Sequence, residues 1–190
     1  MKISIITATW NSSATLRYTM RSVLSQSYPN IEHIIVDGGS TDSTMEIVHE
    51  LEPEYKGKLR YISGKDKGIY DAMNKGIAMA TGDIIGILNS DDFYTSDIVL
   101  STVASAFEDG NIDAVYGDIH YVQDNDLQKC TRYYSSKLFH RRWMRLGFMP
   151  AHPSFYCHKE IYERYGGFNL SYEIAADFEC LLRLIFVHKI

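Results

Sequence analysis

The sequence predicts an α/β fold in which helices cover both faces of an open, mainly parallel sheet. Short apolar segments alternate along the chain with segments whose apolar residues recur at helical spacing. The segment at residues 84–88 has no polar residue, as expected for a central strand that is buried on both faces. Polar or acidic residues follow several of these segments, and open α/β sheets bind ligands just beyond the carboxyl ends of their strands.

The composition narrows the class of protein. A chain of 190 residues, with 45% hydrophobic and 23% charged residues, suits a single soluble domain. The net charge of -5 disfavours nucleic acid, and it disfavours a phosphorylated ligand unless a metal or local positive groups intervene. The three cysteines are widely spaced, so we expect reduced thiols, no zinc site and a cytoplasmic protein. No apolar run approaches the roughly 20 residues of a membrane span.

The first half of the chain shows the clearest alternation, with strands expected at residues 2–8, 32–36, 59–63 and 84–88. The first strand ends in small and polar residues, from Thr7 to Asn11, where a ligand could approach. The second ends at Asp37 and two glycines that permit a tight turn. The glycines do not follow the Gly-x-Gly-x-x-Gly pattern of a dinucleotide fingerprint, and no Lys follows them as a Walker A loop requires. Asp37 is therefore either a ribose or base contact or the cap of a turn.

Asp91 and Asp92 follow the central strand, and no Lys or Arg stands beside them in sequence. Two adjacent carboxylates at the exit of a buried strand repel each other. A divalent cation such as Mg²⁺ or Mn²⁺ would relieve that repulsion, because it prefers hard oxygen ligands. The alternative is an acidic turn that caps the following helix, and this stretch by itself leaves both interpretations open.

The second half is less regular. We expect a helix that Ser96 or Asp97 caps, a strand over 112–119 and a hairpin or loop over 121–134. A strand over 151–156, a helix over 159–165 and a last helix from near Asp177 follow. Asp177 is there either a helix cap or an ionised carboxylate that can act as a general base. His152 is either a site residue or a core histidine. The basic and aromatic segment from Lys137 to Arg145 is a lid, a patch for an anionic membrane or an ordinary surface turn.

Together these positions resemble a known family. Four segments carry the resemblance, in the order that the family has them: Ile5 to Asn11, Val36 to Asp42, Asp66 to Gly76 and Leu88 to Asp92. A fifth, looser match runs from His152 to Asp177. The chain resembles a family-two glycosyltransferase of the GT-A fold, most like bacterial enzymes of surface polysaccharide synthesis. The resemblance implies a Rossmann-like three-layer sandwich in a single domain, 1–190. Its nucleotide-sugar-binding half would be 1–92, and its acceptor-side half, 93–190, is expected to be shortened at the C-terminal end.

The resemblance also implies a role for each matching residue. Thr7, Ala8 and Asn11 would line the nucleotide pocket, and Asn74 would lie near the nucleotide. Asp37, Asp66 and Gly68 would contact the base or ribose. Asp91 and Asp92 match the family's Asp-x-Asp-type motif, with Asp92 as the direct ligand of Mg²⁺ or Mn²⁺, and Asp177 matches the catalytic base. Similar enzymes often have Asp where this chain has Asn89, so fewer protein oxygens would hold the metal.

The activity that the resemblance implies is transfer of a sugar, with inversion, from a nucleotide diphosphate donor to a hydroxyl group. UDP is the favoured nucleotide, and the acceptor would be a saccharide or a lipid-linked molecule at the inner face of the cell membrane. Two alternatives remain. One is a non-catalytic relative that binds nucleotide sugars. The other is a Mg²⁺-dependent phosphoacceptor or phosphatase-like domain, which would want acidic residues where the first strand ends in Thr7, Ala8 and Thr9. The sequence indicates neither the sugar nor the oligomeric state.

Overall fold

The structure is a computed structural model that describes residues 1–108, 110–123 and 126–190. Six strands form one sheet in the order β3-β2-β1-β4-β8-β5, and β6 and β7 form a separate two-stranded ribbon. The strands are β1 Ile3–Thr9, β2 Ile31–Asp37, β3 Leu59–Ser63, β4 Ile84–Ile87, β5 Ala114–Val115, β6 Ile119–Gln123, β7 Asp126–Tyr134 and β8 Tyr156–His158. The α-helices are α1 Leu16–Leu24, α2 Thr44–Leu51, α3 Ile69–Met79, α4 Val99–Phe107, α5 Lys159–Tyr165 and α6 Ala176–Leu181. Shorter helical segments are η1 Glu52–Tyr55, η2 Arg141–Leu146 and η3 His152–Ser154, which are 3₁₀, and η4 Leu182–Val187, which is a π-helix.

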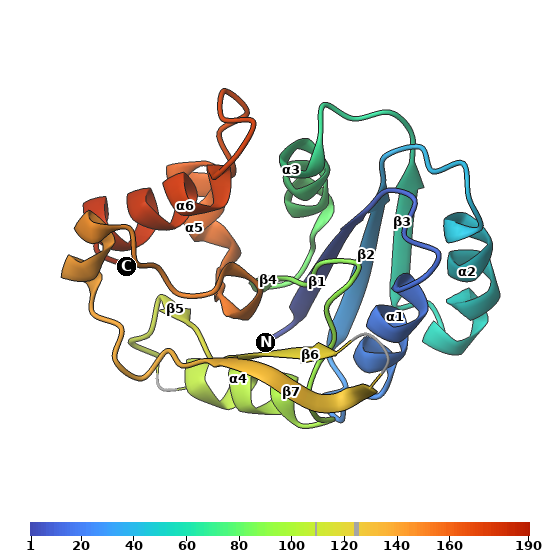
Figure 1. Ribbon diagram of the computed structural model, residues 1–190, viewed down its shortest axis with the longest axis horizontal. Helices are drawn as coiled ribbons and strands as arrows, with labels where there is room; N and C mark the ends of the chain where they lie inside the picture. Colours follow the sequence, from blue (N-terminus) through green and yellow to red (C-terminus); the bar gives the residue numbers. More distant parts are fainter. Residues whose placement is uncertain (109, 124–125) are drawn as a thin grey trace.

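The predicted three-layer arrangement is confirmed, because two apolar cores lie on opposite faces of the sheet (Figure 1). Successive side chains of a strand point to opposite faces. In β1, Ile3 and Ile5 therefore pack with helices α1, α2 and α4, whereas Ile6 and Ala8 pack with α3, α5 and α6. All seven residues of β1 are buried, as expected for a strand that is covered on both sides.

The mainly parallel character of the sheet is also confirmed. Strands β3, β2, β1 and β4 run parallel to one another, and only β8 runs antiparallel, between β4 and β5. The four parallel strands consequently end at one edge of the sheet. That edge carries the loops in which the sequence places most of its candidate site residues.

Three element predictions for the second half are wrong in extent. The strand predicted over 112–119 pairs with β8 only at Ala114–Val115, and the chain then leaves the sheet before β6 begins. The strand predicted over 151–156 begins only at Tyr156, because Pro153 has no N–H for a sheet and takes part in the 3₁₀ turn η3 instead. Helix α4 begins at Val99, and its N-cap is Ile98 and not Ser96 or Asp97.

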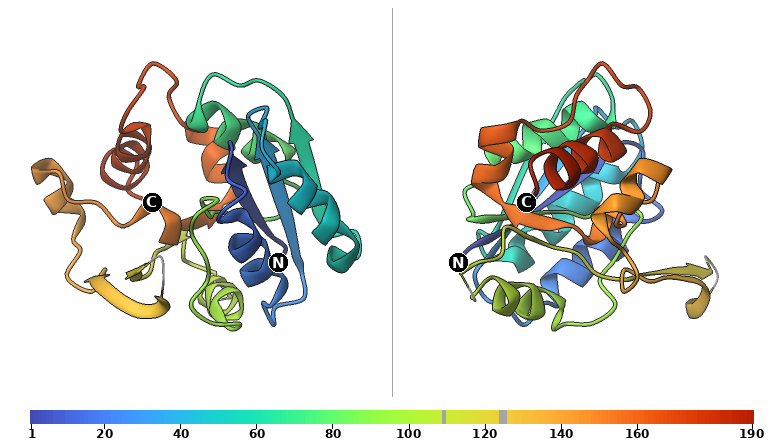
Figure 2. Two further views of the ribbon diagram at one scale, coloured as in Figure 1. Left: turned by 45° about the vertical axis from the view of Figure 1, so that its right-hand side comes forward. Right: turned by 90° about the vertical axis from the view of Figure 1, so that its left-hand side faces the viewer.

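The predicted hairpin is confirmed over the described residues. Strands β6 and β7 pair antiparallel from the Ile119–Tyr134 pair to the Gln123–Asp126 pair, and residues 124–125 lie outside the described residues. Figure 2 shows this ribbon standing away from the main sheet. It therefore adds a surface to the domain and not a seventh strand to its core.

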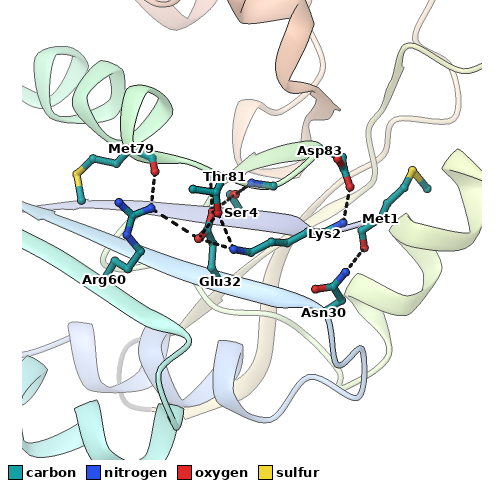
Figure 3. A network of polar contacts seen from close by, with 10 residues as sticks. Met1, Lys2, Ser4, Asn30, Glu32, Arg60, Met79, Thr81 and Asp83 are labelled. Carbon is teal, nitrogen blue, oxygen red and sulfur yellow. Dashed lines mark hydrogen bonds and ion pairs between the residues drawn. The ribbon is translucent and has the colours of Figure 1, made fainter.

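At the opposite end of the strands, Glu32 forms a buried polar network that joins β1, β2 and the segment before β4 (Figure 3). Its carboxylate accepts hydrogen bonds from Lys2 Nζ at 2.8 Å, Ser4 Oγ at 2.6 Å and the Thr81 N–H at 2.6 Å. Burial would raise the pKa of Glu32, but the bonds from Lys2, Ser4 and Thr81 outweigh it and lower the pKa to about 2.

Replacing Glu32 with glutamine is expected to lower the free energy of unfolding at pH 7 by about 2 to 3 kcal/mol. The carboxyl pKa is lower in the folded than in the unfolded chain, so its contribution is present above the unfolded pKa of 4.5 and is lost as the pH falls toward 2. Urea unfolding from pH 7 to pH 2 checks this. The difference between Glu32→Gln and the parent should shrink with falling pH, whereas Glu50→Gln, at an exposed ion pair with Arg17, should change little. A difference that does not depend on pH would contradict the assignment.

Candidate active site

The predicted nucleotide-binding residues gather where the parallel strands end. The register of β1, β2 and β3 places Thr9, Asp37 and Ser63 side by side. Asp37 is almost fully buried, and its carboxylate accepts hydrogen bonds from the N–H groups of Gly39 and Ser40. The hydroxyls of Ser40 and Ser63 also donate to it. These bonds support the interpretation of Asp37 as the residue that caps the turn, and its contact with a base or ribose stays a prediction.

Thr7, Ala8 and Asn11 lie at different depths of this edge. Thr7 and Ala8 are buried in β1, and the Thr7 hydroxyl donates to the Leu88 carbonyl at 2.8 Å. Asn11 adopts φ 50°, a left-handed conformation that Asn visits more readily than most residues. Its side-chain oxygen accepts from the Thr41 N–H at 2.9 Å, which ties the loop after β1 to the loop after β2. Thr7 and Ala8 thus lie beneath the edge, and the assignment of all three to a nucleotide pocket stays a prediction.

Trp10 is a feature of this edge that the site prediction did not include. Its side chain is 68% exposed, although it follows seven buried residues. A large exposed aromatic ring can stack on a flat ligand ring. The signal in the sequence was an indole directly after an apolar strand and directly before Asn11.

The loop between β3 and α3 brings Asp66 and Gly68 to the same edge. A Cβ atom on Gly38 would lie 3.1 Å from Asp66 Oδ2, so this carboxylate packs against the turn that follows β2. The Gly68 N–H donates to Asp66 Oδ1 at 3.1 Å. Gly68 adopts φ 110° immediately before α3, a conformation that favours glycine. Asp66 and Gly68 therefore lie beside the turn that Asp37 holds.

Asn74 has a structural task that its sequence context did not indicate. Its amide nitrogen donates to the Phe168 carbonyl at 2.8 Å, and its amide oxygen accepts from the Phe168 N–H at 2.8 Å. A Cβ atom on Gly167 would lie 2.2 Å from Asn74 Oδ1, so this close approach requires glycine. Asn74 thereby joins α3 to the segment before α6. Its predicted place near the nucleotide stays a prediction.

The two carboxylates after β4 have different surroundings. Asp91 is exposed, whereas Asp92 is partly buried and accepts a hydrogen bond from Asn89 Nδ2 at 2.9 Å. Burial, together with the charge of Asp91, raises the pKa of Asp92 to about 6, although the hydrogen bonds from Asn89 oppose the shift. The ionised form of Asp92 is therefore disfavoured in the protein alone.

The residues around Asp92 fit a hard divalent cation. Asn89 Oδ1 is buried and has no hydrogen-bond partner among the described residues. An unpartnered oxygen beside a destabilised carboxylate is a donor set of the kind that Mg²⁺ or Mn²⁺ prefers. Within the described ranges, no cluster of three or more His, Cys, Asp or Glu side chains could hold a metal. An ion at Asp92 would therefore take further ligands from phosphate oxygens and water.

Asp177 lies in the first turn of α6. The N-cap of this helix is Ala175, at φ 66°, and no side-chain hydrogen bond caps the helix. The interpretation of Asp177 as a helix cap is therefore wrong. Its carboxylate instead accepts a hydrogen bond from the Tyr70 hydroxyl at 3.1 Å and lies 3.4 Å from His152 Nδ1.

His152 lies between the two acidic sites. Its Nδ1 faces Asp177, and its Nε2 lies 3.5 Å from Asn89 Nδ2. Burial lowers the pKa of His152, an effect that the charge of Asp177 opposes. His152 and Asp177 line a small cavity together with Ile87, Phe155 and Phe168. These contacts favour the interpretation of His152 as a site residue, which stays a prediction. Tyr70 is a further neighbour of Asp177 that the site prediction did not include.

Comparison with known proteins decides the family of this chain. The family profile described as Glycosyl transferase family 2 matches residues 4–166. The chain belongs to glycosyltransferase family 2. The match covers all the predicted site residues except Asp177. Membership of this family gives no support to the phosphoacceptor or phosphatase-like alternative.

Two mycobacterial glycosyltransferases are among the proteins that this chain resembles in sequence. The PGL/p-HBAD biosynthesis glycosyltransferase of Mycobacterium bovis is 30% identical over 181 residues, which cover 95% of this chain and 68% of the relative. An uncharacterized glycosyltransferase of Mycobacterium tuberculosis is 34% identical over 189 residues, which cover 97% of this chain and 69% of the relative.

Solved structures confirm the GT-A fold of the family-2 chain. TarS 1-349 of Staphylococcus aureus, in complex with UDP, superposes with a TM-score of 0.80 at 19% identity, over 97% of this chain and 55% of that one. The mannosyltransferase PcManGT of Pyrobaculum calidifontis, in complex with GDP-Man and Mn²⁺, superposes with a TM-score of 0.70 at 20% identity, over 93% and 49%. The chain thus spans about half the length of these structures.

Proposed function

We propose that the chain is an inverting glycosyltransferase that uses a nucleotide diphosphate sugar, with UDP as the favoured nucleotide. The acceptor is a hydroxyl group of a saccharide or a lipid-linked molecule, in the synthesis of cell-surface polysaccharide at the inner face of the membrane. One observation carries the proposal. His152 lies between Asp177 and Asn89, and Asn89 in turn donates a hydrogen bond to Asp92. The unpartnered Asn89 oxygen suits a cation, and the Asp177 carboxylate does not cap its helix.

The mechanism assigns different tasks to the two carboxylates. Asp92 and Asn89 would hold Mg²⁺ or Mn²⁺, which when bound supplies positive charge for a diphosphate leaving group. Asp177 takes the proton from the acceptor hydroxyl as the acceptor oxygen bonds to the anomeric carbon. The bond from that carbon to the diphosphate breaks on the opposite side, and its electron pair leaves with the diphosphate. A single displacement of this kind inverts the configuration and needs no carboxylate nucleophile, unlike a retaining hydrolase.

The edge of the sheet supports the donor half of the proposal. Trp10 offers an exposed ring for the base, and Asp66 lies at the turn that Asp37 holds. Calorimetric titration of UDP and of GDP, each with and without Mn²⁺, tests the donor site. Release of the nucleotide from the matching sugar nucleotide on addition of acceptor then tests transfer. Binding without transfer would favour the non-catalytic alternative, and binding of neither nucleotide would contradict the donor site.

Peripheral contact with a membrane belongs to the same proposal. None of the helices in the described part of the chain has the length and apolar character needed to cross a bilayer. The sequence from Lys137 to Arg145 nevertheless contains four Lys and Arg residues and no Asp or Glu. We call this stretch the basic segment. Leu138 within it is 86% exposed, and Leu146 directly after it is 67% exposed. Exposed basic and apolar side chains together suit an anionic lipid surface.

Replacing Arg141 and Arg142 with glutamine is expected to weaken binding to vesicles that contain anionic lipid by roughly 30-fold, because each basic residue near such a surface contributes about 1 kcal/mol. Sedimentation with vesicles at low and physiological salt measures this binding. The higher salt concentration should weaken vesicle binding of the parent protein more than that of the variant. The matched control replaces Lys56 and Lys58 with glutamine, which also removes two charges. These residues lie before β3, at the other edge of the sheet. Equal losses in both variants, or no binding of the parent, would contradict the membrane contact.

A further inference from the structure

Two side chains from distant parts of the sequence hold the two oxygens of Asp177. Tyr70, in the first turn of α3, donates its hydroxyl to Asp177 Oδ1 at 3.1 Å. His152, in η3, brings its Nδ1 within 3.4 Å of Asp177 Oδ2. Each carboxylate oxygen therefore has one neighbour on the protein, and neither neighbour belongs to α6.

Packing fixes both of these neighbours. The Tyr70 ring stacks on Phe168 with ring centroids 5.6 Å apart. The backbone of Phe168 is itself held at both its N–H and its carbonyl by Asn74, one turn further along α3. His152 stands on a 3₁₀ turn that contains Pro153, so its backbone has little freedom. The carboxylate is thus held by groups whose own positions are restricted.

The hydrogen-bond donors around His152 indicate which nitrogen carries the proton. Asn89 Nδ2 is a donor only, so His152 Nε2 must accept from it at 3.5 Å. In a neutral imidazole the other nitrogen, Nδ1, then carries the hydrogen, on the side of the ring that lies 3.4 Å from Asp177 Oδ2. The same amide donates its other hydrogen to Asp92 Oδ2 at 2.9 Å. A continuous series of contacts therefore runs from Tyr70 through Asp177, His152 and Asn89 to Asp92.

We propose that Tyr70 and His152 are positioning residues that hold the Asp177 carboxylate in place for the acceptor hydroxyl, and that His152 also sets its position relative to the Asn89–Asp92 pair. This inference rests on the proposed function. Asp177 Oδ1 keeps a second lone pair after it accepts the hydrogen bond from Tyr70, so the carboxylate can still take the acceptor's proton. The hydrogen bond from Tyr70 and the contact with His152 restrict the rotation of the side chain away from that proton.

The expected effect is on the rate of transfer and not on donor binding. A displacement of about 1 Å in a reacting group can lower a rate by about 100-fold. Tyr70→Phe and His152→Gln are therefore each expected to lower kcat by roughly 10- to 100-fold, while the Kd for nucleotide with Mn²⁺ stays within about twofold. His152→Asn can keep a donor near the position of Nδ1, so it should retain more activity than His152→Gln.

Two control variants match these changes away from Asp177. Tyr134→Phe removes a hydroxyl that donates to the Met149 carbonyl at 2.7 Å, and His158→Gln removes an imidazole whose ring packs on the edge of Phe107. Both should leave kcat unchanged. Unaltered kcat in Tyr70→Phe and His152→Gln would overturn the proposal, as would a parallel loss of nucleotide binding, which would indicate a purely structural role.

A second measurement does not depend on activity. Nitrogen NMR of the chain labelled at histidine, with His152→Gln used to assign the signal, reports which ring nitrogen carries the proton. We expect Nδ1–H at neutral pH. Finding Nε2–H instead would overturn the arrangement even if transfer is observed. If Nδ1–H is found but no sugar nucleotide supports transfer, the arrangement stands and the proposed function fails.

Discussion

Replacing Asp177 with asparagine is expected to lower the rate of sugar transfer by roughly 10²- to 10⁴-fold, the usual contribution of a general base. The amide cannot take a proton from the acceptor hydroxyl, whereas its size and shape are nearly those of the carboxylate. Because the Asp177 side chain does not cap α6, the helix loses no capping bond in this variant, and the lost charge in its first turn costs only about 0.3 to 1 kcal/mol. Nucleotide binding with Mn²⁺ should therefore be unchanged, and the fall should be in kcat, measured as nucleotide released on addition of acceptor.

Asp71→Asn is the matched control for Asp177. The Asp71 side chain is 18% exposed and that of Asp177 is 17% exposed, so both changes remove a charge at a similar depth. Asp71 pairs with Lys75 on the same helix, at 3.0 Å. We expect its variant to keep its activity. A comparable loss of kcat in both variants, or unfolding of Asp177→Asn, would contradict the assignment of Asp177 as the base.

Replacing Asp92 with asparagine is expected to have two opposite effects. It should weaken Mn²⁺-dependent nucleotide binding by at least about 10- to 100-fold, because even the outer-shell partners of metal ligands have effects of that size. It should also stabilise the ligand-free chain by about 1 to 3 kcal/mol at pH 7, since burial and Asp91 raise the pKa of Asp92 to about 6 and so disfavour its charge. Calorimetry and urea unfolding with a chelator present measure the two effects.

The sign of the stability effect follows from the direction of the pKa shift. A carboxyl whose pKa is raised on folding binds more protons in the native state, so its charge costs stability above the folded pKa. A gain in stability that accompanies a loss of binding is the expected behaviour of a functional residue. Asn89→Asp offers the reverse change, because a second carboxylate beside Asp92 should tighten Mn²⁺ binding and lower the stability of the ligand-free chain. Loss of stability in Asp92→Asn would indicate instead that Asp92 serves as a cap.

Local patterns in the sequence determined the layered fold and the places where its chemistry could lie. Period-2 and period-3.6 repeats depend only on neighbouring residues, so β3 was predicted at 59–63 and α5 at 159–165, with the bounds that the structure shows. The acidic residues Asp37, Asp92 and Asp177 stand at ends of elements that the same patterns define. The extent of β5 and β8 was wrong because a short edge strand depends on its pairing partner, which no local pattern specifies.

Only the tertiary structure decided which side chains meet. Tyr70 and Asp177 are 107 residues apart, and their contact exists because α3 and α6 pack on the same face of the sheet. The same packing turns Asn74 toward the backbone of Phe168. Burial in the folded chain, together with the charge of Asp91, raises the pKa of Asp92. Burial and hydrogen bonding depend on every element that surrounds a group. The sequence could therefore name Asp177 and His152 as candidates, but their mutual contact and their link to Asp92 required the folded chain.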